Sequence, residues 1–110
     1  MDIKRIEELK HIHSDYLRLS EKCQREYMRN KKGMEYEKNG KIEEAIAMYE
    51  LNVDENSEGL HPYKRLAILY DKFKLSSEAK RVLKSGIRNV AGDKHRQELA
   101  SRLLKIETKA

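Results

Sequence analysis

The chain has 110 residues, of which 39% are charged and 38% hydrophobic, with one Pro, five Gly and no Trp. This length allows one domain with a modest core, and the composition favours exposed amphipathic helices, so we expect an all-α fold rather than a sheet. The single cysteine excludes an intrachain disulfide, and the sequence has no apolar run near the roughly 20 residues that cross a bilayer.

The net charge of +5 is unevenly distributed along the chain. Residues 1–32 carry nine basic residues (Lys or Arg) and six acidic ones. Residues 33–60 carry two basic and eight acidic residues, and residues 61–110 carry thirteen basic and five acidic residues. Basic stretches can bind phosphate backbones, although charged helices more often expose a solvated face. The first residues are charged and do not resemble a signal peptide, so we expect a cytoplasmic protein.

The first predicted element is a long helix over residues 2–39, since residues 1–32 contain neither Gly nor Pro. Its a and d positions form a seam that runs into the next hairpin: Ile6, Leu9, His13, Tyr16, Ser20, Cys23, Tyr27, Asn30 and Met34. An unbroken helix leaves this seam uncovered, so we predict a homodimer through the N-terminal helix. The alternative is a shorter helix that bends near Arg29 and caps its own repeat.

The sequence contains two similar predicted helical hairpins, with a period of 34 residues. The period pairs Gly33 with Ala67, Tyr36 with Tyr70, and Ala45 with Ala79. Small residues at these positions allow two helices to pack closely, and the tyrosines fill the space beside them, each with its hydroxyl at the edge of the core.

This pattern resembles the tetratricopeptide repeat, whose 34-residue unit reads W-x-x-L-G-x-x-Y, then A-x-x-x-F, then P. The second copy, HPYKRLAILYDKFKLSSEAKRVL, matches better than the first, in which Arg29 and Lys32 stand for the Trp and Leu. The phrase HPYKRLAILYDK is also similar to short proteins of this type from bacteria and phages. The resemblance implies a right-handed array of two hairpins over residues 27–92, after an N-terminal helical extension over 1–26 and before a capping helix over 93–110.

Turn residues predict where the later helices begin and end. Asn39 and Gly40 end the first helix, Asn56–Gly59 forms the loop between the repeats, and Pro62 suits a first helical turn. Asp93 is expected to be the N-cap of the last helix, whose stripe contains Leu99, Ala100, Leu103 and Leu104. The predicted helices after the first cover residues 41–53, 62–74, 77–90 and 94–108.

The sequence contains no pattern that indicates catalysis, a metal or a cofactor. His11 and His13 point to different faces of a helix, Cys23 is interpreted as a small apolar residue of the seam, and Glu43 and Glu44 suit the first turn of a helix. Gly-rich phosphate loops and nucleophile elbows are absent from the sequence. We therefore expect no enzyme.

The tetratricopeptide resemblance implies a groove, lined by the first helix of each hairpin, that binds a peptide or a partner helix. Mapped onto this sequence, the groove consists of Tyr27, Asn30, Met34, Lys38, His61, Lys64, Arg65, Ile68 and Lys72. Its lysines and arginine predict a ligand of acidic character. The predicted function is a protein interaction module. The alternative is a nucleic-acid-associated factor that uses the basic C-terminal half, including Lys80, Arg81, Lys84 and Arg88.

Overall fold

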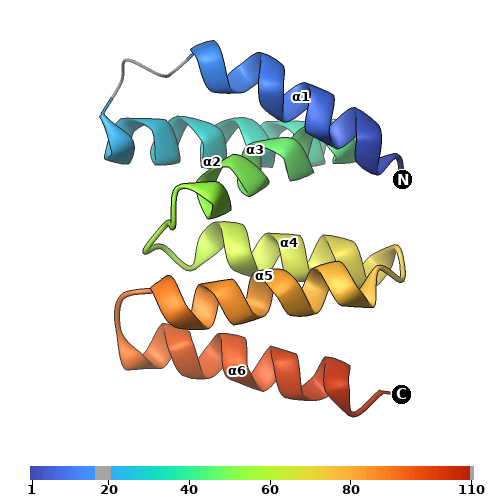
Figure 1. Ribbon diagram of the computed structural model, residues 1–110, viewed down its shortest axis with the longest axis vertical. Coiled ribbons are helices and arrows are strands. Elements are labelled where there is room, and N and C mark those ends of the chain that lie inside the picture. Colours follow the sequence, from blue (N-terminus) through green and yellow to red (C-terminus); the bar gives the residue numbers. More distant parts are fainter. Residues whose placement is uncertain (17–20, 110) are drawn as a thin grey trace. The chain divides into compact units, whose positions relative to one another are not determined.

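The computed structural model describes residues 1–16 and 21–109, with side chains except at residues 14–16. The described chain is entirely helical, which confirms the predicted all-α class (Figure 1). Its helices are α1 (Ile3–Tyr16), α2 (Lys22–Lys38), α3 (Ile42–Asp54), α4 (His61–Lys72), α5 (Ser76–Asn89) and α6 (Asp93–Glu107).

The chain forms two compact units, residues 1–55 and residues 56–110. Each predicted hairpin falls within one unit: α2 and α3 belong to the first, and α4 and α5 to the second. The helices from α3 onward begin and end within two residues of the predicted positions.

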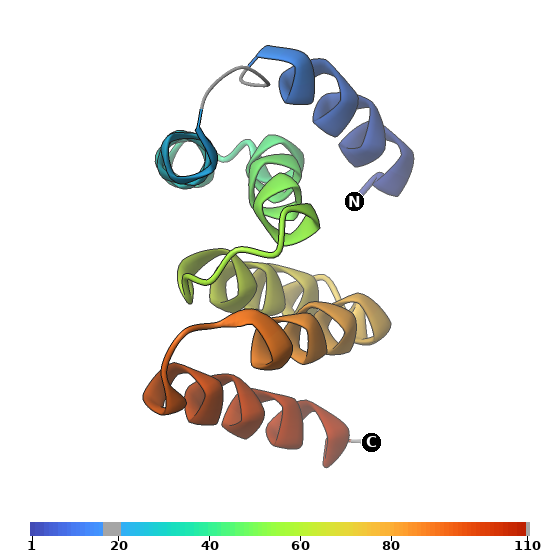
Figure 2. The same ribbon diagram turned by 60° about the vertical axis from the view of Figure 1, so that its left-hand side comes forward.

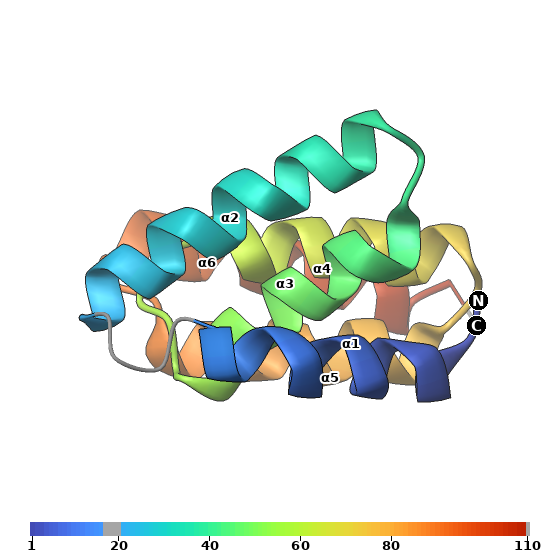
Figure 3. The ribbon, with the colours of Figure 1, turned by 90° about the horizontal axis from the view of Figure 1, so that it is seen from above.

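In the first unit α3 lies between α1 and α2, as Figures 2 and 3 show from two directions. Polar contacts at both ends of α3 hold α1 parallel to it. The backbone N–H of Asp2 donates to Glu43 at 2.7 Å, and Arg5 forms an ion pair with Glu44 at 2.9 Å. At the other end, Lys10 pairs with Asp54 at 2.7 Å. The two glutamates in the first turn of α3 therefore anchor α1 as well as suiting the helix dipole.

The prediction of one unbroken helix over residues 2–39 is wrong. The first helix ends at Tyr16, and the second begins at Lys22 after Glu21, whose backbone is extended. The physical reason is the apolar stripe of α1, because Ile6 is only 2% exposed and α1 packs on α3. Residues 22–38 pack antiparallel on α3. If residues 2–39 formed one straight helix, its N-terminal part would extend away from α3, and Ile6 could not be buried against α3.

The predicted seam is thus divided between two helices. Ile6 is buried, and Leu9 and His13 are partly buried. Burial and the nearby charge of Lys32 both lower the pKa of His13. The side chains of Tyr16 and Ser20 lie outside the described residues, and Cys23, interpreted as a small apolar residue of the seam, is exposed. The first half of the seam packs on α3 of the same chain, as the alternative prediction of a shorter first helix has it. However, α1 ends at Tyr16, well before Arg29.

The packing of α2 on α3 depends on Gly33. A Cβ atom at this position would lie 2.6 Å from Cζ of Tyr49, whose ring is fully buried against the glycine. The Tyr49 hydroxyl donates to Glu37 at 2.6 Å, at the edge of the contact. Gly33, predicted as a small residue that allows two helices to pack closely, therefore lies against a large side chain of α3, and the phenol retains a hydrogen-bond partner.

In the second unit α5 packs on both α4 and α6. It approaches them closely at Gly86, where a Cβ would lie 2.6 Å from Leu99 and 2.7 Å from Cγ of Tyr63. The Tyr63 hydroxyl donates to the Ser57 carbonyl at 2.6 Å. The repeat comparison did not indicate Gly86, because the register of 34 residues pairs it with Asn52, a large polar residue.

The turns follow the predicted chemistry with one exception. Gly40 has φ +75, as a left-handed residue after a helix requires, and Pro62 lies in the first turn of α4. Asp93, however, is the first residue of α6 rather than its cap, and its carboxylate accepts a hydrogen bond from Arg96 at 2.7 Å. The stripe predicted for α6 is buried only in part, since Leu99 is fully buried whereas Leu104 is 61% exposed and Ala100 is exposed.

Replacing either packed glycine by alanine tests these close approaches. Alanine favours a helix by about 1 kcal/mol over glycine, yet we expect Gly33→Ala and Gly86→Ala each to lower the free energy of unfolding by about 1–3 kcal/mol because of overpacking. Urea denaturation measures this change. Gly59→Ala is the control, because its Cβ would make only an ordinary 3.6 Å contact with Ser57. Wild-type stability of Gly86→Ala would contradict the close approach.

Candidate partner-binding surfaces

The predicted groove residues are divided between the two units. Tyr27, Asn30, Met34 and Lys38 lie on α2, and the other five lie on α4. The two sets are therefore described separately, and a continuous groove that joins them stays a prediction.

An uncovered apolar strip lies on α2, which we call the α2 strip and define as Cys23, Tyr27 and Met34. Tyr27 is 64% exposed and Met34 is 55% exposed. Cys23 is exposed too, and together with Gln24, Tyr27 and Met28 it lines a shallow hollow of about 400 Å³. Single exposed apolar residues are ordinary, but several on one side of one helix form a candidate contact surface.

The other two predicted residues on α2 differ in their surroundings. The Asn30 side chain accepts a hydrogen bond of 3.0 Å from Asn52, which also donates to the Glu26 carbonyl at 3.1 Å. Asn30 thus helps to hold α2 on α3. Lys38 is exposed in the last turn of α2. Of the predicted set on this helix, Tyr27, Met34 and Lys38 are exposed to a ligand.

Behind the strip, an ion cluster that the repeat comparison missed fixes α2 to the end of α3. Arg25 binds the Glu55 carboxylate through two nitrogens, at 2.9 and 2.6 Å, and Arg29 contacts the same carboxylate at 2.5 Å. Arg29 is only 4% exposed. The predicted alignment with the tetratricopeptide pattern puts Arg29 at the position of the Trp, and the structure has a buried ion pair there.

The hydrogen bonds from Arg25, followed by those from Arg29, lower the pKa of Glu55 to about 2. The pKa of Glu55 is therefore below its unfolded value, and the carboxylate stabilises the first unit fully above about pH 4.5. This stabilisation is lost as the pH falls from there toward 2.

We expect Glu55→Gln to lower the free energy of unfolding at pH 7 by about 1–3 kcal/mol, because buried Arg29 loses its charged partner. The difference from wild type should shrink between pH 4.5 and 2, where Glu55 itself becomes protonated. Thermal unfolding followed by circular dichroism over this range measures the effect. Glu58→Gln is the matched control, since Glu58 is exposed. A difference that stays constant down to pH 2 would rule out the cluster as the cause.

On α4, Lys64 and Lys72 contact other side chains of the second unit. Lys64 forms an ion pair with Glu98 of α6 at 3.2 Å, and the Lys72 ammonium lies 5.9 Å from the centre of the Phe73 ring. His61 and Arg65 are partly buried. The positive charge of Lys64 is therefore partly compensated before any ligand binds.

Ile68, the fifth predicted residue on α4, lines a pocket between α4 and α6. This α4–α6 pocket has a volume of about 200 Å³ and is lined by Ala67, Ile68, Asp71, Arg102, Lys105, Ile106 and Lys109. Lys109 pairs with Asp71 across it at 3.0 Å. The sequence prediction included Ile68 only, because the groove was drawn from the repeats and α6 was regarded as a cap.

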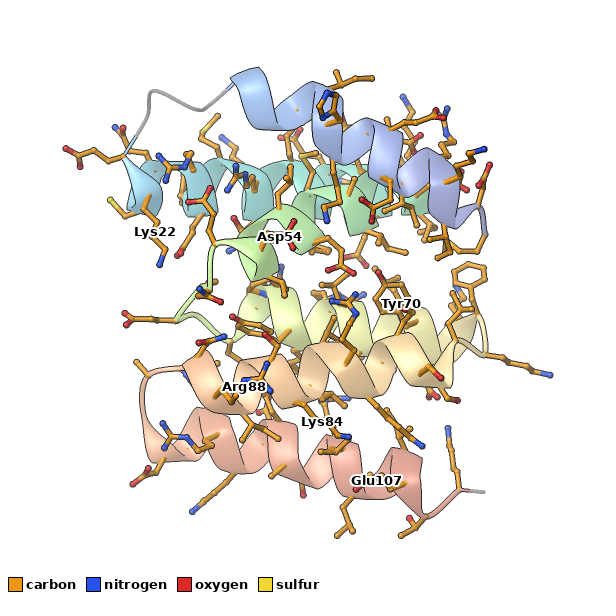
Figure 4. The ribbon with its side chains drawn as sticks, in the orientation of Figure 1. Lys22, Asp54, Tyr70, Lys84, Arg88 and Glu107 are labelled. Atoms are coloured by element: carbon orange, nitrogen blue, oxygen red, sulfur yellow. The ribbon has the colours of Figure 1, made fainter. Side chains whose placement is uncertain are left out.

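The basic residues of α5 form the candidate surface for the alternative function. Lys84 and Arg88, labelled in Figure 4, are exposed and lie one helical turn apart. Arg81, which is also exposed, forms an ion pair with Glu78 at 2.8 Å. The stripe therefore combines cations with one compensating acid.

Within residues 1–16 and 21–109, the structure contains no group of three or more His, Cys, Asp or Glu side chains placed to hold a metal ion. The helices of the described chain are also too short or too polar to span a membrane. Neither a protein-family model nor a curated protein nor a solved structure matches the chain.

Proposed function

We propose that the chain is a non-catalytic helical interaction module that binds an acidic amphipathic segment of a partner protein, with α2 as a docking helix. One observation carries this proposal: Tyr27 and Met34 remain 64% and 55% exposed on a helix that is firmly held by α3. Because the helix is already ordered, a partner can bury this apolar surface at a small conformational cost.

The charges beside the α2 strip favour an acidic partner. Lys31 follows Tyr27 by four residues and Lys38 follows Met34 by four, so both exposed lysines lie along the same edge of the strip. A partner helix with an apolar stripe and carboxylates along one edge would match this arrangement, since complementary charges set the orientation and speed of association.

The tetratricopeptide-like arrangement belongs to the same proposal. The contact between Gly33 and Tyr49, at positions where the repeat pattern has a small and a large residue, supports it.

A labelled synthetic peptide tests the proposal without knowledge of the natural partner. The peptide has Leu at its a and d positions and Glu at the flanking positions, and a second peptide carries Lys in place of Glu. Fluorescence anisotropy should show binding of the Glu peptide and much weaker binding of the Lys peptide. We expect Met34→Ser to weaken the Glu peptide by about tenfold, since burying a methionine contributes about 1.5–3 kcal/mol.

Leu104→Ser is the matched control for this measurement, because Leu104 is 61% exposed on α6 in the other unit. Equal binding of the two peptides would refute the acidic specificity. Unchanged binding by Met34→Ser would remove α2 as the docking helix.

A second copy of the chain is the competing occupant of the α2 strip, and the homodimer predicted from the sequence stays a prediction. Light scattering at tens of micromolar separates the two, because a dimer that Met34→Ser dissociates would place the copies at this strip. A monomer leaves the strip available to a different protein.

The basic stripe on α5 favours nucleic-acid binding as a second candidate function. For a labelled 20-base DNA strand, the logarithm of the affinity should fall linearly with the logarithm of salt concentration. The double variant Lys84→Gln, Arg88→Gln should reduce this slope by about 1–2, whereas Lys94→Gln, an exposed lysine at the start of α6, should change it less. A slope near zero for the wild-type protein would eliminate this function.

A further inference from the structure

The α4–α6 pocket combines positive charge with an aliphatic wall. Its lining contains three cationic side chains, Arg102, Lys105 and Lys109, and one carboxylate, Asp71. Both helices belong to the second unit, and two ion pairs connect them: Lys64 of α4 with Glu98 of α6, and Asp71 of α4 with Lys109, which follows α6.

The positive charges are not equally available to a ligand. Lys109 is already paired with Asp71 at 3.0 Å. Arg102 differs, because its Nε is buried from solvent and donates to no acceptor among the described residues. Because water does not reach this nitrogen, a ligand oxygen does not reach it either. An anion in the pocket would bind the exposed part of the half-buried Arg102 side chain, whose charge no acceptor at Nε compensates.

The remaining lining is aliphatic. Ala67 and Ile68 of α4 face Ile106 of α6 across the pocket. A volume of about 200 Å³ is below the 300–1,000 Å³ of sites that hold drug-sized ligands, so the pocket suits one side chain or a similarly small molecule.

We propose that the α4–α6 pocket binds a carboxylate carried on a short branched aliphatic body. The guanidinium of Arg102 and the ammonium of Lys105 receive the carboxylate, and the body lies against Ile68 and Ile106. Guanidinium groups match a planar carboxylate through two parallel hydrogen bonds, while the apolar wall excludes a small, fully hydrated anion such as phosphate. This inference goes beyond the proposed function, since the pocket uses no residue of α2.

Two sources can supply this ligand chemistry: the C-terminal residue of another polypeptide, or a free aliphatic acid. N-acetyl-leucine represents the first source and 4-methylpentanoate the second. N-acetyl-leucinamide has the same body as N-acetyl-leucine without the carboxylate, and sodium phosphate provides an anion without the body.

The experiment is a titration of the ¹⁵N-labelled full chain with each of these four compounds, followed by amide chemical shifts. We expect both acids to shift the backbone amide signals of Ile68 and Ile106 in a saturable manner. N-acetyl-leucinamide and phosphate should cause no saturable shift. Arg102→Met keeps the aliphatic stem and removes the charge, so it should weaken the acids at least tenfold.

Lys94→Met is the matched control, because Lys94 is an exposed cation in the first turn of the same helix and lies outside the pocket. Should Arg102→Met fail to fold, Lys105→Met replaces it, since Lys105 is exposed and its loss should weaken the acids at least threefold.

Tighter binding of N-acetyl-leucine identifies a chain terminus as the ligand, and tighter binding of 4-methylpentanoate identifies a free acid. Comparable affinities mean that the pocket recognises only the carboxylate and the aliphatic body. Saturable binding of N-acetyl-leucinamide or phosphate with the affinity of the acids would overturn the proposal, as would wild-type affinity in the folded variants or the absence of shifts with either acid. The α2 variant Met34→Ser should leave the titration unchanged, so this inference and the proposed function can fail separately.

Discussion

The contact between Gly33 and Tyr49 decides which face of α2 is left exposed. With no side chain at residue 33, the Tyr49 ring lies directly on the backbone of α2 and orients the helix about its own axis. At 3.6 residues per turn, Met34 and Tyr27 lie about 100° and 120° around the helix from Gly33, on one side. A larger residue at position 33 would displace the tyrosine and change both the separation of the helices and the direction of the strip.

The ion cluster at the other end of α2 has the same effect by electrostatic means. Arg25 and Arg29 both bind Glu55, and Asn30 accepts a hydrogen bond from Asn52, so five polar residues secure the helix against rotation. Burying Arg29 would be unfavourable without Glu55, because an unpaired buried charge destabilises a fold by several kcal/mol. The cluster therefore specifies the orientation of α2 more clearly than an apolar contact of the same size, which could slide.

A structural feature could be predicted from the sequence when it depends on residues that lie close together in the chain. Helix limits after Gly40 were predicted well, because Gly40, Pro62 and the small residues act through their immediate neighbours. The break between α1 and α2 was missed because it depends on a distant helix: Ile6 is buried by α3, more than 30 residues further along the chain. The close packing at Gly86 and the position of Arg102 in a pocket were missed for the same reason, since both depend on where α6 packs.

The division of the predicted seam also changes what the strip can bind. With Ile6 covered by α3, the part of the seam left exposed is about the length of α2, 17 residues or roughly 25 Å. One helix packed along this length buries less than the roughly 800 Å² per partner that is usual in stable complexes. Two copies packed antiparallel about a two-fold axis would in addition bring the exposed Lys31 and Lys38 of each molecule close to those of the other. An acidic helix removes this repulsion and adds attraction, so charge favours a different protein over a second copy as the occupant of the strip.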